Sequence, residues 1–251
     1  MYMVGVTKTG FAVIGGSRSL GTNHATSDID LLIVSGSQRK IENKDGYNII
    51  YWPADQFISA FSNAENGYSH IYQFLYPEDF LSTGELTDWV KSNRDSIIAE
   101  NRDVLYHTIS SYFFAIESKL TIYYKIAIKR VVYIMCYGKM LCSYADGINL
   151  SDCFCAKGEW RNTLLKALNN RLTYDEVASI VSELHEKIQS VSSFFEPTAS
   201  KSVTNELKER FLTSEFMNYN ELKEGGLIPM GAALPLTDAE TAVKILLGET
   251  D

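Results

Sequence analysis

Residues 13–34 join two apolar runs through one short polar loop, and this stretch constrains the fold more than any other. The first run ends in Gly-Gly-Ser at 15–17, and the second begins between Asp28 and Asp30. Short runs rich in Ile, Leu and Val, bounded by glycine and polar residues, predict buried strands. The loop is too short to separate the two strands widely, so the glycine turn is expected near the aspartates.

The two aspartates favour a metal site. Residues two apart on a strand face the same way, which places Asp28 and Asp30 on one face about 7 Å apart at Cα. Ile29 and Leu31 then point into a core. Paired carboxylates are hard oxygen ligands for Mg²⁺, or for Mn²⁺ in its place. Such ions bridge a nucleoside triphosphate and an attacking hydroxyl in two-metal sites.

The glycine turn favours phosphate binding. At Gly15 and Gly16 a phosphate can approach the backbone N–H groups closely, because no side chain intervenes. Ser17 adds a hydroxyl, a helix starting there would add its positive end, and Arg18 can add charge-assisted hydrogen bonds. A strand–Gly-Gly-Ser–helix turn also occurs without any ligand. The aspartates that follow make the phosphate interpretation the stronger one.

The Gly-Gly-Ser turn followed by Ser-Asp-Ile-Asp-Leu-Leu resembles the signature of the DNA polymerase β-like nucleotidyltransferase superfamily. Residues 28–34, 47–61 and 66–77 further resemble a bacterial and phage predicted-nucleotidyltransferase family that is associated with RNA repair. The resemblance implies an α+β fold with a small mixed sheet, flanking helices and then an all-helical domain. It also implies a metal-dependent transferase that moves a nucleoside monophosphate from a triphosphate such as ATP to a hydroxyl.

One departure from the superfamily pattern concerns catalysis. The superfamily usually has a third carboxylate on the next strand, and aligning residues 47–57 puts Asn48 there. Asparagine can coordinate a metal through its carbonyl but is no general base at neutral pH. Asp45 and Asp55 are alternative carboxylates, although strand parity does not favour Asp55. The chain is therefore either an active enzyme with two carboxylates, a slow one, or a catalytically inactive module that binds a nucleotide or a partner protein.

Periodicity divides the rest of the chain. A strand is predicted at 47–52. From about residue 87 the spacing of apolar residues predicts long helices. We predict a nucleotidyltransferase core at 1–85, a helical bundle that binds substrate at 86–220, and a linker with a short helix at 221–251. The predicted helices cover residues 54–61, 68–76, 88–101, 104–144, 159–168, 174–194 after a capping box at Thr173, 205–219, and a last one from 237.

Two lysines in the long helical stretch are candidates for phosphate contacts. Lys125 and Lys129 are four residues apart, so they are predicted to share one helix face. They are predicted to hold the β- and γ-phosphates across a cleft from the aspartates. A solvated helix face is the alternative. The tyrosines nearby are expected in the core, because helical spacing explains them without a ligand: Tyr123, Tyr124, Tyr133 and Tyr137.

Composition limits the remaining choices. A net charge of −8 over 251 residues argues against coating nucleic acid non-specifically. The longest apolar stretch, 109–141, is interrupted by charged residues and is not expected to cross a membrane. Four irregularly spaced cysteines and no export leader predict a cytoplasmic protein. The expected partners are a nucleoside triphosphate and an acceptor, which is an RNA end, a protein or a small molecule; the oligomeric state is not predicted.

Overall fold

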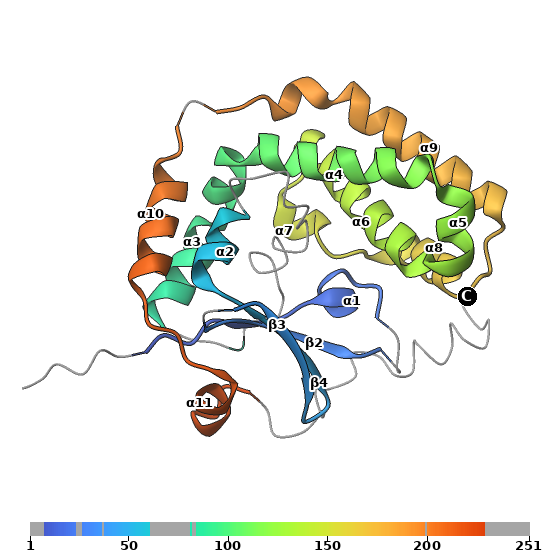
Figure 1. Ribbon diagram of the computed structural model, residues 1–251. Coiled ribbons are helices and arrows are strands. Elements are labelled where there is room, and N and C mark those ends of the chain that lie inside the picture. Colours follow the sequence, from blue (N-terminus) through green and yellow to red (C-terminus); the bar gives the residue numbers. More distant parts are fainter. Residues whose placement is uncertain are drawn as a thin grey trace, which may run out of the picture.

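The computed structural model describes residues 8–23, 27–36, 38–60, 81, 84–198 and 200–228. A small mixed sheet lies against a group of helices that follows it in sequence (Figure 1). The predicted α+β class is therefore confirmed. The predicted helices at 68–76 and from 237 lie outside the described residues, and the division at residues 85 and 220 stays a prediction.

The sheet has four strands in the order β1-β2-β4-β3. The central pair β2 and β4 is parallel, and both outer pairs are antiparallel. Two predicted strands, 29–34 and 47–52, have the observed bounds. β3 was not predicted, because its sequence Lys-Ile-Glu-Asn-Lys is mostly polar and typical of an exposed edge. The bounds are β1 Ala12–Ile14, β2 Ile29–Val34, β3 Lys40–Lys44 and β4 Tyr47–Trp52.

Eleven α-helices and one short 3-10 segment, Ser192–Phe195, occur among the described residues. The predicted capping box is confirmed: the Thr173 hydroxyl accepts from the Glu176 N–H, and the Glu176 carboxylate accepts from the Thr173 N–H at 2.6 Å. The helices are α1 Gly16–Ser19, α2 Ala54–Ser59, α3 Glu85–Glu100, α4 Arg102–Glu117, α5 Leu120–Ile126, α6 Ile128–Ala145, α7 Leu150–Cys153, α8 Gly158–Leu168, α9 Tyr174–Ser190, α10 Ser202–Thr213 and α11 Tyr219–Glu224.

The single helical stretch predicted at 104–144 is wrong. The chain forms α4, α5 and α6, with breaks at Lys119 and at Ala127, whose φ of −148° and ψ of 41° are not helical. The apolar stripe continues across the breaks, because Ile116, Leu120 and Val131 are all buried. Likewise, the helix predicted at 205–219 ends at Thr213 as α10, and the separate α11 begins only at Tyr219.

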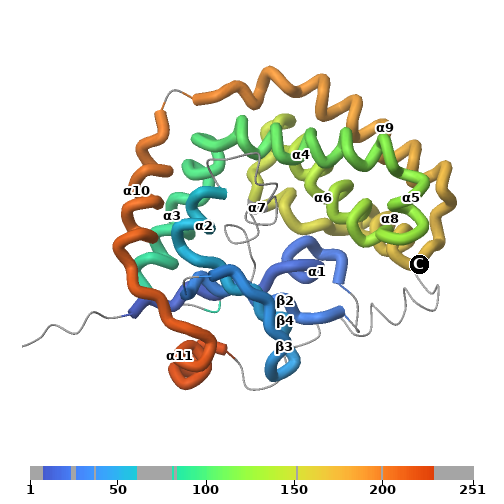
Figure 2. Tube along the Cα trace, viewed as in Figure 1, coloured from blue at the N-terminus to red at the C-terminus, as the bar shows by residue number. Residues whose placement is uncertain are grey.

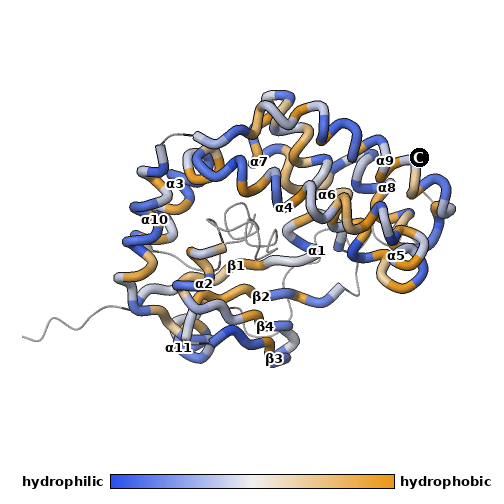
Figure 3. The backbone as a smooth tube through the Cα atoms, turned by 45° about the horizontal axis from the view of Figure 1, so that its top comes forward, coloured by the Kyte–Doolittle hydropathy of each residue, from blue (hydrophilic) through white to orange (hydrophobic). Residues whose placement is uncertain are grey.

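Both faces of the sheet are buried. Phe11, Val13 and Leu32 pack toward the helices, while Leu31 and Ile33 belong to a second apolar cluster with residues of α11. Figure 3 shows apolar residues along β1 and β2 between these layers. A strand covered on both sides needs an almost continuous apolar run, which is what residues 29–34 supply.

The end of the described chain returns to its beginning. Thr9 accepts a hydrogen bond from the Met217 N–H at 2.9 Å and donates its own N–H to the Glu215 carbonyl at 2.6 Å. Figure 2 shows the resulting path, in which α10 and α11 lie beside the sheet. No helix among the described residues has the length and apolar character needed to traverse a bilayer.

Candidate functional site

Asp30 and Asn48 are direct neighbours in the central strand pair. β2 and β4 run parallel with Asp30 opposite Asn48, and the Asn48 Nδ2 donates a 2.6 Å hydrogen bond to the Asp30 Oδ1. Asp30 is half-buried, while Asp28 lies just before β2 and is exposed. The structure thus places an amide where the sequence alignment put the third carboxylate.

The glycine turn contacts the same aspartate. The Gly15 N–H donates to the Asp30 carbonyl at 2.8 Å. Gly16 has φ +64°, and a Cβ built there would lie 1.8 Å from the Asp30 Oδ2. Only glycine fits a position that combines a left-handed backbone with such close approach. The turn and the carboxylate therefore form one site.

The segment after the turn is short and internally braced. A helix begins at the turn as predicted, but α1 has only four residues, so the positive charge at its start is weak. The Ser19 hydroxyl donates to the Gly16 carbonyl at 3.0 Å, and the Thr22 N–H to the Ser17 carbonyl at 2.8 Å. The groups here that can donate a hydrogen bond to an anion are backbone N–H groups of the turn and the hydroxyl of the buried Ser17. The Nε of Arg18 is buried with no hydrogen-bond partner in the described part of the chain.

Tyr133 of α6 is a site residue that the sequence interpretation assigned to the core. Its hydroxyl is buried, and it makes no hydrogen bond of standard geometry to any described residue. Burial raises the pKa of Tyr133, and the negative charges of Asp30 and, less strongly, Asp28 raise it further; the nearby Ser17 hydroxyl lowers it. The phenol therefore keeps its proton at neutral pH and is a hydrogen-bond donor beside the aspartates.

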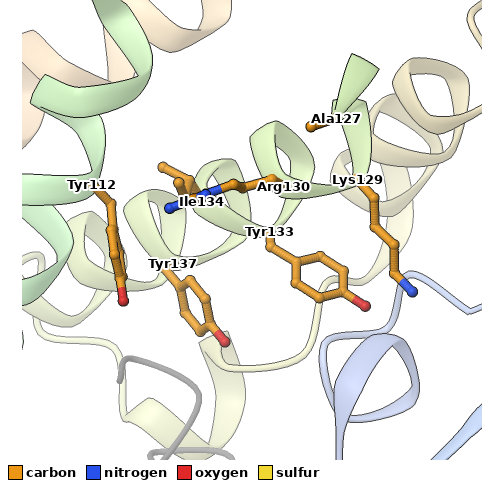
Figure 4. Close-up of a pocket in the computed structure, with 7 residues that line it drawn as sticks. All are labelled: Tyr112, Ala127, Lys129, Arg130, Tyr133, Ile134 and Tyr137. Atoms are coloured by element: carbon orange, nitrogen blue, oxygen red, sulfur yellow. The ribbon is translucent and has the colours of Figure 1, made fainter. Parts of the chain in front are cut away.

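Lys129 lies one helical turn before Tyr133 and lines the same pocket, which has a volume of about 420 Å³. Its Nζ is 5.7 Å from the centre of the Tyr133 ring. Figure 4 shows both polar tips pointing the same way, toward the segment that holds α1. Spacing offered one signal for Tyr133: residues 129 and 133 share a helix face, so placing the lysine at the site places the tyrosine there too.

Lys125 and Lys129 do not share a helix face, so this prediction is wrong. Lys125 lies in the last turn of α5 and Lys129 in the first turn of α6, with the break at Ala127 between them. Lys125 is exposed and is not among the described residues that line the Tyr133 pocket. Its contact with a phosphate stays a prediction, and so does that of Lys129.

Residues 8–105 match the nucleotidyltransferase domain family model. The match covers β1 to the start of α4, including the turn, both aspartates and Asn48, and it supports the resemblance to the DNA polymerase β-like superfamily. It does not test the closer resemblance to the RNA-repair family. Neither a curated protein nor a solved structure matches the chain.

The two alternative carboxylates, Asp45 and Asp55, are poor substitutes for the third carboxylate of the superfamily pattern. Asp45 lies in a hollow of about 490 Å³ with Asp28 and Asn48, but its Oδ2 accepts from Lys223 at 2.7 Å and Tyr219 at 2.8 Å. The hydrogen bond from Lys223 is the main cause that lowers the Asp45 pKa. Asp55 follows the opposite end of β4 and is exposed.

A second element of the helical region contacts the segment that follows the glycine turn. Arg161 of α8 donates from Nε to the Gly21 carbonyl at 2.9 Å and from Nη2 to the Asn23 carbonyl at 3.3 Å. The Ala156 N–H donates to the Leu20 carbonyl at 3.0 Å. These contacts hold the loop that leaves the glycine turn and leads toward Asp28.

The donor set fits a hard divalent cation with few protein ligands. Asp28 and Asp30 supply carboxylate oxygens, which Mg²⁺ prefers, and Mg²⁺ usually keeps several waters and substrate oxygens. The Asp30 Oδ2 is the atom nearest the position of the missing Gly16 side chain, so a ligand on this oxygen lies against the glycine turn. No group of three His, Cys, Asp or Glu gathers among the described residues. A cation held by Asp28 and Asp30 would take its remaining ligands from water and substrate.

Proposed function

We propose that this protein is a metal-dependent nucleotidyltransferase, which moves a nucleoside monophosphate from a nucleoside triphosphate to a hydroxyl of an acceptor. The observation that carries the proposal is the contact of Asp30 with Gly16, because it joins a candidate phosphate turn to a candidate metal ligand. The nucleotidyltransferase domain match over residues 8–105 supports the same reaction class.

The chain's own groups have defined parts in this proposal. The Gly16 backbone N–H and the Ser17 hydroxyl bind the triphosphate, with Lys129 and Tyr133 donating from α6. Gly15 keeps its N–H on the Asp30 carbonyl, and its missing side chain lets the phosphate approach the turn. Donors fixed before the substrate arrives stabilise charge without reorganising during the reaction. A Mg²⁺ or Mn²⁺ ion on Asp28 and Asp30 would neutralise phosphate charge and lower the pKa of the acceptor hydroxyl.

Asn48 positions Asp30 in this scheme. Its amide donates to the Asp30 Oδ1, which fixes the carboxylate with its Oδ2 toward the glycine turn. Asn48 accepts no proton, so the proton of the acceptor hydroxyl would pass to solvent or to a phosphate oxygen, and pyrophosphate would leave as the new bond to the α-phosphorus forms. The resemblance to the RNA-repair family makes an RNA end the first acceptor to test.

The four free cysteines are consistent with a cytoplasmic protein.

Asn48 also favours a second candidate function. An amide at the third position lowers the negative charge of the site and removes a potential general base. A module that binds a nucleotide or a partner protein without transferring the nucleotidyl group is compatible with the same turn and aspartates.

Labelled nucleoside triphosphates, incubated with Mg²⁺ or Mn²⁺ and RNA or protein acceptors, separate these functions. Asp28→Asn and Asp30→Asn keep the side-chain shape and remove the charge, and Asp55→Asn on the exposed start of α2 is the matched control. Transfer that is lost in the first two variants and kept in the control supports the enzyme. Metal-dependent nucleotide binding without transfer to any acceptor supports the module.

A further inference from the structure

The pocket between α4 and α6 has the chemistry of a site for one planar ring with an attached anion. Its volume is about 420 Å³. Tyr137 and Ile134 are buried in it, while Tyr112 and Tyr133 are half-buried. Lys129 and Arg130 are exposed and lie at its edge. Pockets with an apolar lining and a few polar groups bind small molecules, and aromatic side chains with nearby cations suit nucleotides.

The order of these residues along α6 gives the pocket a direction. Lys129, Tyr133 and Tyr137 recur at four-residue steps, so they follow one helix face over about 12 Å. Figure 4 shows them in this order, with Tyr112 of α4 beyond Tyr137. The Lys129 end of this row adjoins the segment that holds α1. Tyr137 and Tyr112 lie away from that segment, and the Arg130 side chain extends toward them. A ligand with its phosphates at the glycine turn would place its ring among the tyrosines.

We propose that this pocket binds the nucleobase of the donor nucleoside triphosphate. Tyr112 and Tyr137 provide ring surfaces for the base, and Tyr133 lies at the junction between the base and the phosphates. This inference rests on the proposed function and adds the site of the donor base to it. The sequence interpretation of Tyr133 and Tyr137 as core residues changes accordingly: both contribute to packing and both line the pocket.

Inorganic tripolyphosphate carries the phosphates without the base, so it isolates the contribution of the pocket. Isothermal titration with Mg²⁺ compares tripolyphosphate with each of the four ribonucleoside triphosphates. At least one triphosphate is expected to bind roughly five- to hundredfold more tightly than tripolyphosphate, the range that stacking of one base supplies. Equal affinity of tripolyphosphate and all four nucleotides overturns the inference.

Variants locate the effect. Tyr112→Leu is expected to remove most of the preference for the nucleotide and to leave tripolyphosphate binding unchanged. Ala127→Leu fills the pocket instead of emptying it and is expected to give the same result, which guards against a folding defect in one variant. Tyr106→Leu, on the same helix and stacked on Phe195 at 5.3 Å, is the matched control. A preference that survives in both pocket variants places the base elsewhere.

The outcome separates the inference from the proposed function. If tripolyphosphate and nucleotides bind equally, and both need Asp28 and Asp30, the donor site stands and the base pocket fails. If neither ligand binds in the presence of Mg²⁺, both proposals fail together. Lys129→Met is expected to weaken both ligands alike, since it lies at the phosphate end.

Discussion

The Asn48 amide donates a 2.6 Å hydrogen bond to the Asp30 carboxylate across the parallel pair of strands β2 and β4. An uncharged donor at this distance compensates part of the negative charge of Asp30. A site that must receive both a cation and a polyanion benefits from a carboxylate that is held in one orientation. Replacing Asn48 therefore tests how much negative charge the site needs.

Asn48→Asp is expected to make the stability of the protein more dependent on metal. Two facing carboxylates repel each other without a cation, and a bound divalent ion relieves that repulsion. Mg²⁺ should therefore raise the melting temperature of the variant by ~2–4 °C more than that of the wild type, the shift that about 1 kcal/mol gives in a chain of this size. Scanning calorimetry with Mg²⁺ and with a chelator measures this difference.

Asn43→Asp provides the control for that prediction. Asn43 pairs with Asn48 from the other side, on the edge strand β3, and is exposed. A carboxylate there adds the same charge to the sheet but does not occupy the position beside Asp30. Equal Mg²⁺ effects in the two variants would show that the Asn48 position is not part of a metal site.

Gly16→Ala is expected to destabilise the folded state through two effects. A left-handed backbone at a non-glycine residue costs about 1–3 kcal/mol, and the new Cβ would in addition meet the Asp30 Oδ2 at 1.8 Å. Gly158→Ala isolates the first effect, because Gly158 has φ +56° and no atom lies within 4 Å of its Cβ position. Urea denaturation should give a larger loss for Gly16→Ala; equal losses would contradict the close contact.

The sequence predicted the two central strands and the position of Asn48 because buried strands leave an apolar signature. β3 left none, since an edge strand between charged residues needs no apolar face. The break at Ala127 carries no glycine or proline, so local sequence did not reveal it. Tyr133 has the spacing of a core residue, but it also shares a helix face with Lys129, and that signal could have placed it at the site. Arg161 binds backbone carbonyls. Every residue has a carbonyl, so the sequence does not show which ones Arg161 contacts.

Glu100 links α3 to the start of α10, and its replacement by glutamine tests that link. Its carboxylate accepts the N–H groups of Val203 and Thr204 and the hydroxyls of Thr204 and Ser202. Glu100→Gln is expected to lower the free energy of unfolding by about 1–2 kcal/mol near pH 7, the range of a lost helix cap. Glu206→Gln on the exposed face of α10 is the control, since its pair with Arg210 is solvated.

The effect of Glu100 also depends on pH. Burial raises the pKa of Glu100, but the hydrogen bonds from the Thr204 and Val203 amides and from the two hydroxyls outweigh it, so the pKa lies below the usual 4.5. A carboxylate with a lowered pKa stabilises the fold above its unfolded pKa, and this contribution is lost as the pH falls through the folded value. The difference between wild type and Glu100→Gln should therefore shrink below about pH 4.5; a constant difference would contradict the cap.

Arg161→Met is expected to loosen the loop between the glycine turn and Asp28 without unfolding α8. The variant keeps the apolar stem of the side chain and removes both hydrogen bonds to the Gly21 and Asn23 carbonyls. Amide hydrogen exchange of a peptide spanning residues 16–23 should accelerate, while exchange in α8 stays near that of the wild type.

Under the proposed function the affinity of Arg161→Met for Mg²⁺-tripolyphosphate should also fall, since the same loop positions the phosphate turn. Lys166→Met, an exposed cation on the same helix, controls for the lost charge. Unchanged exchange in Arg161→Met would mean that the loop is held by the Ala156–Leu20 hydrogen bond and its own packing.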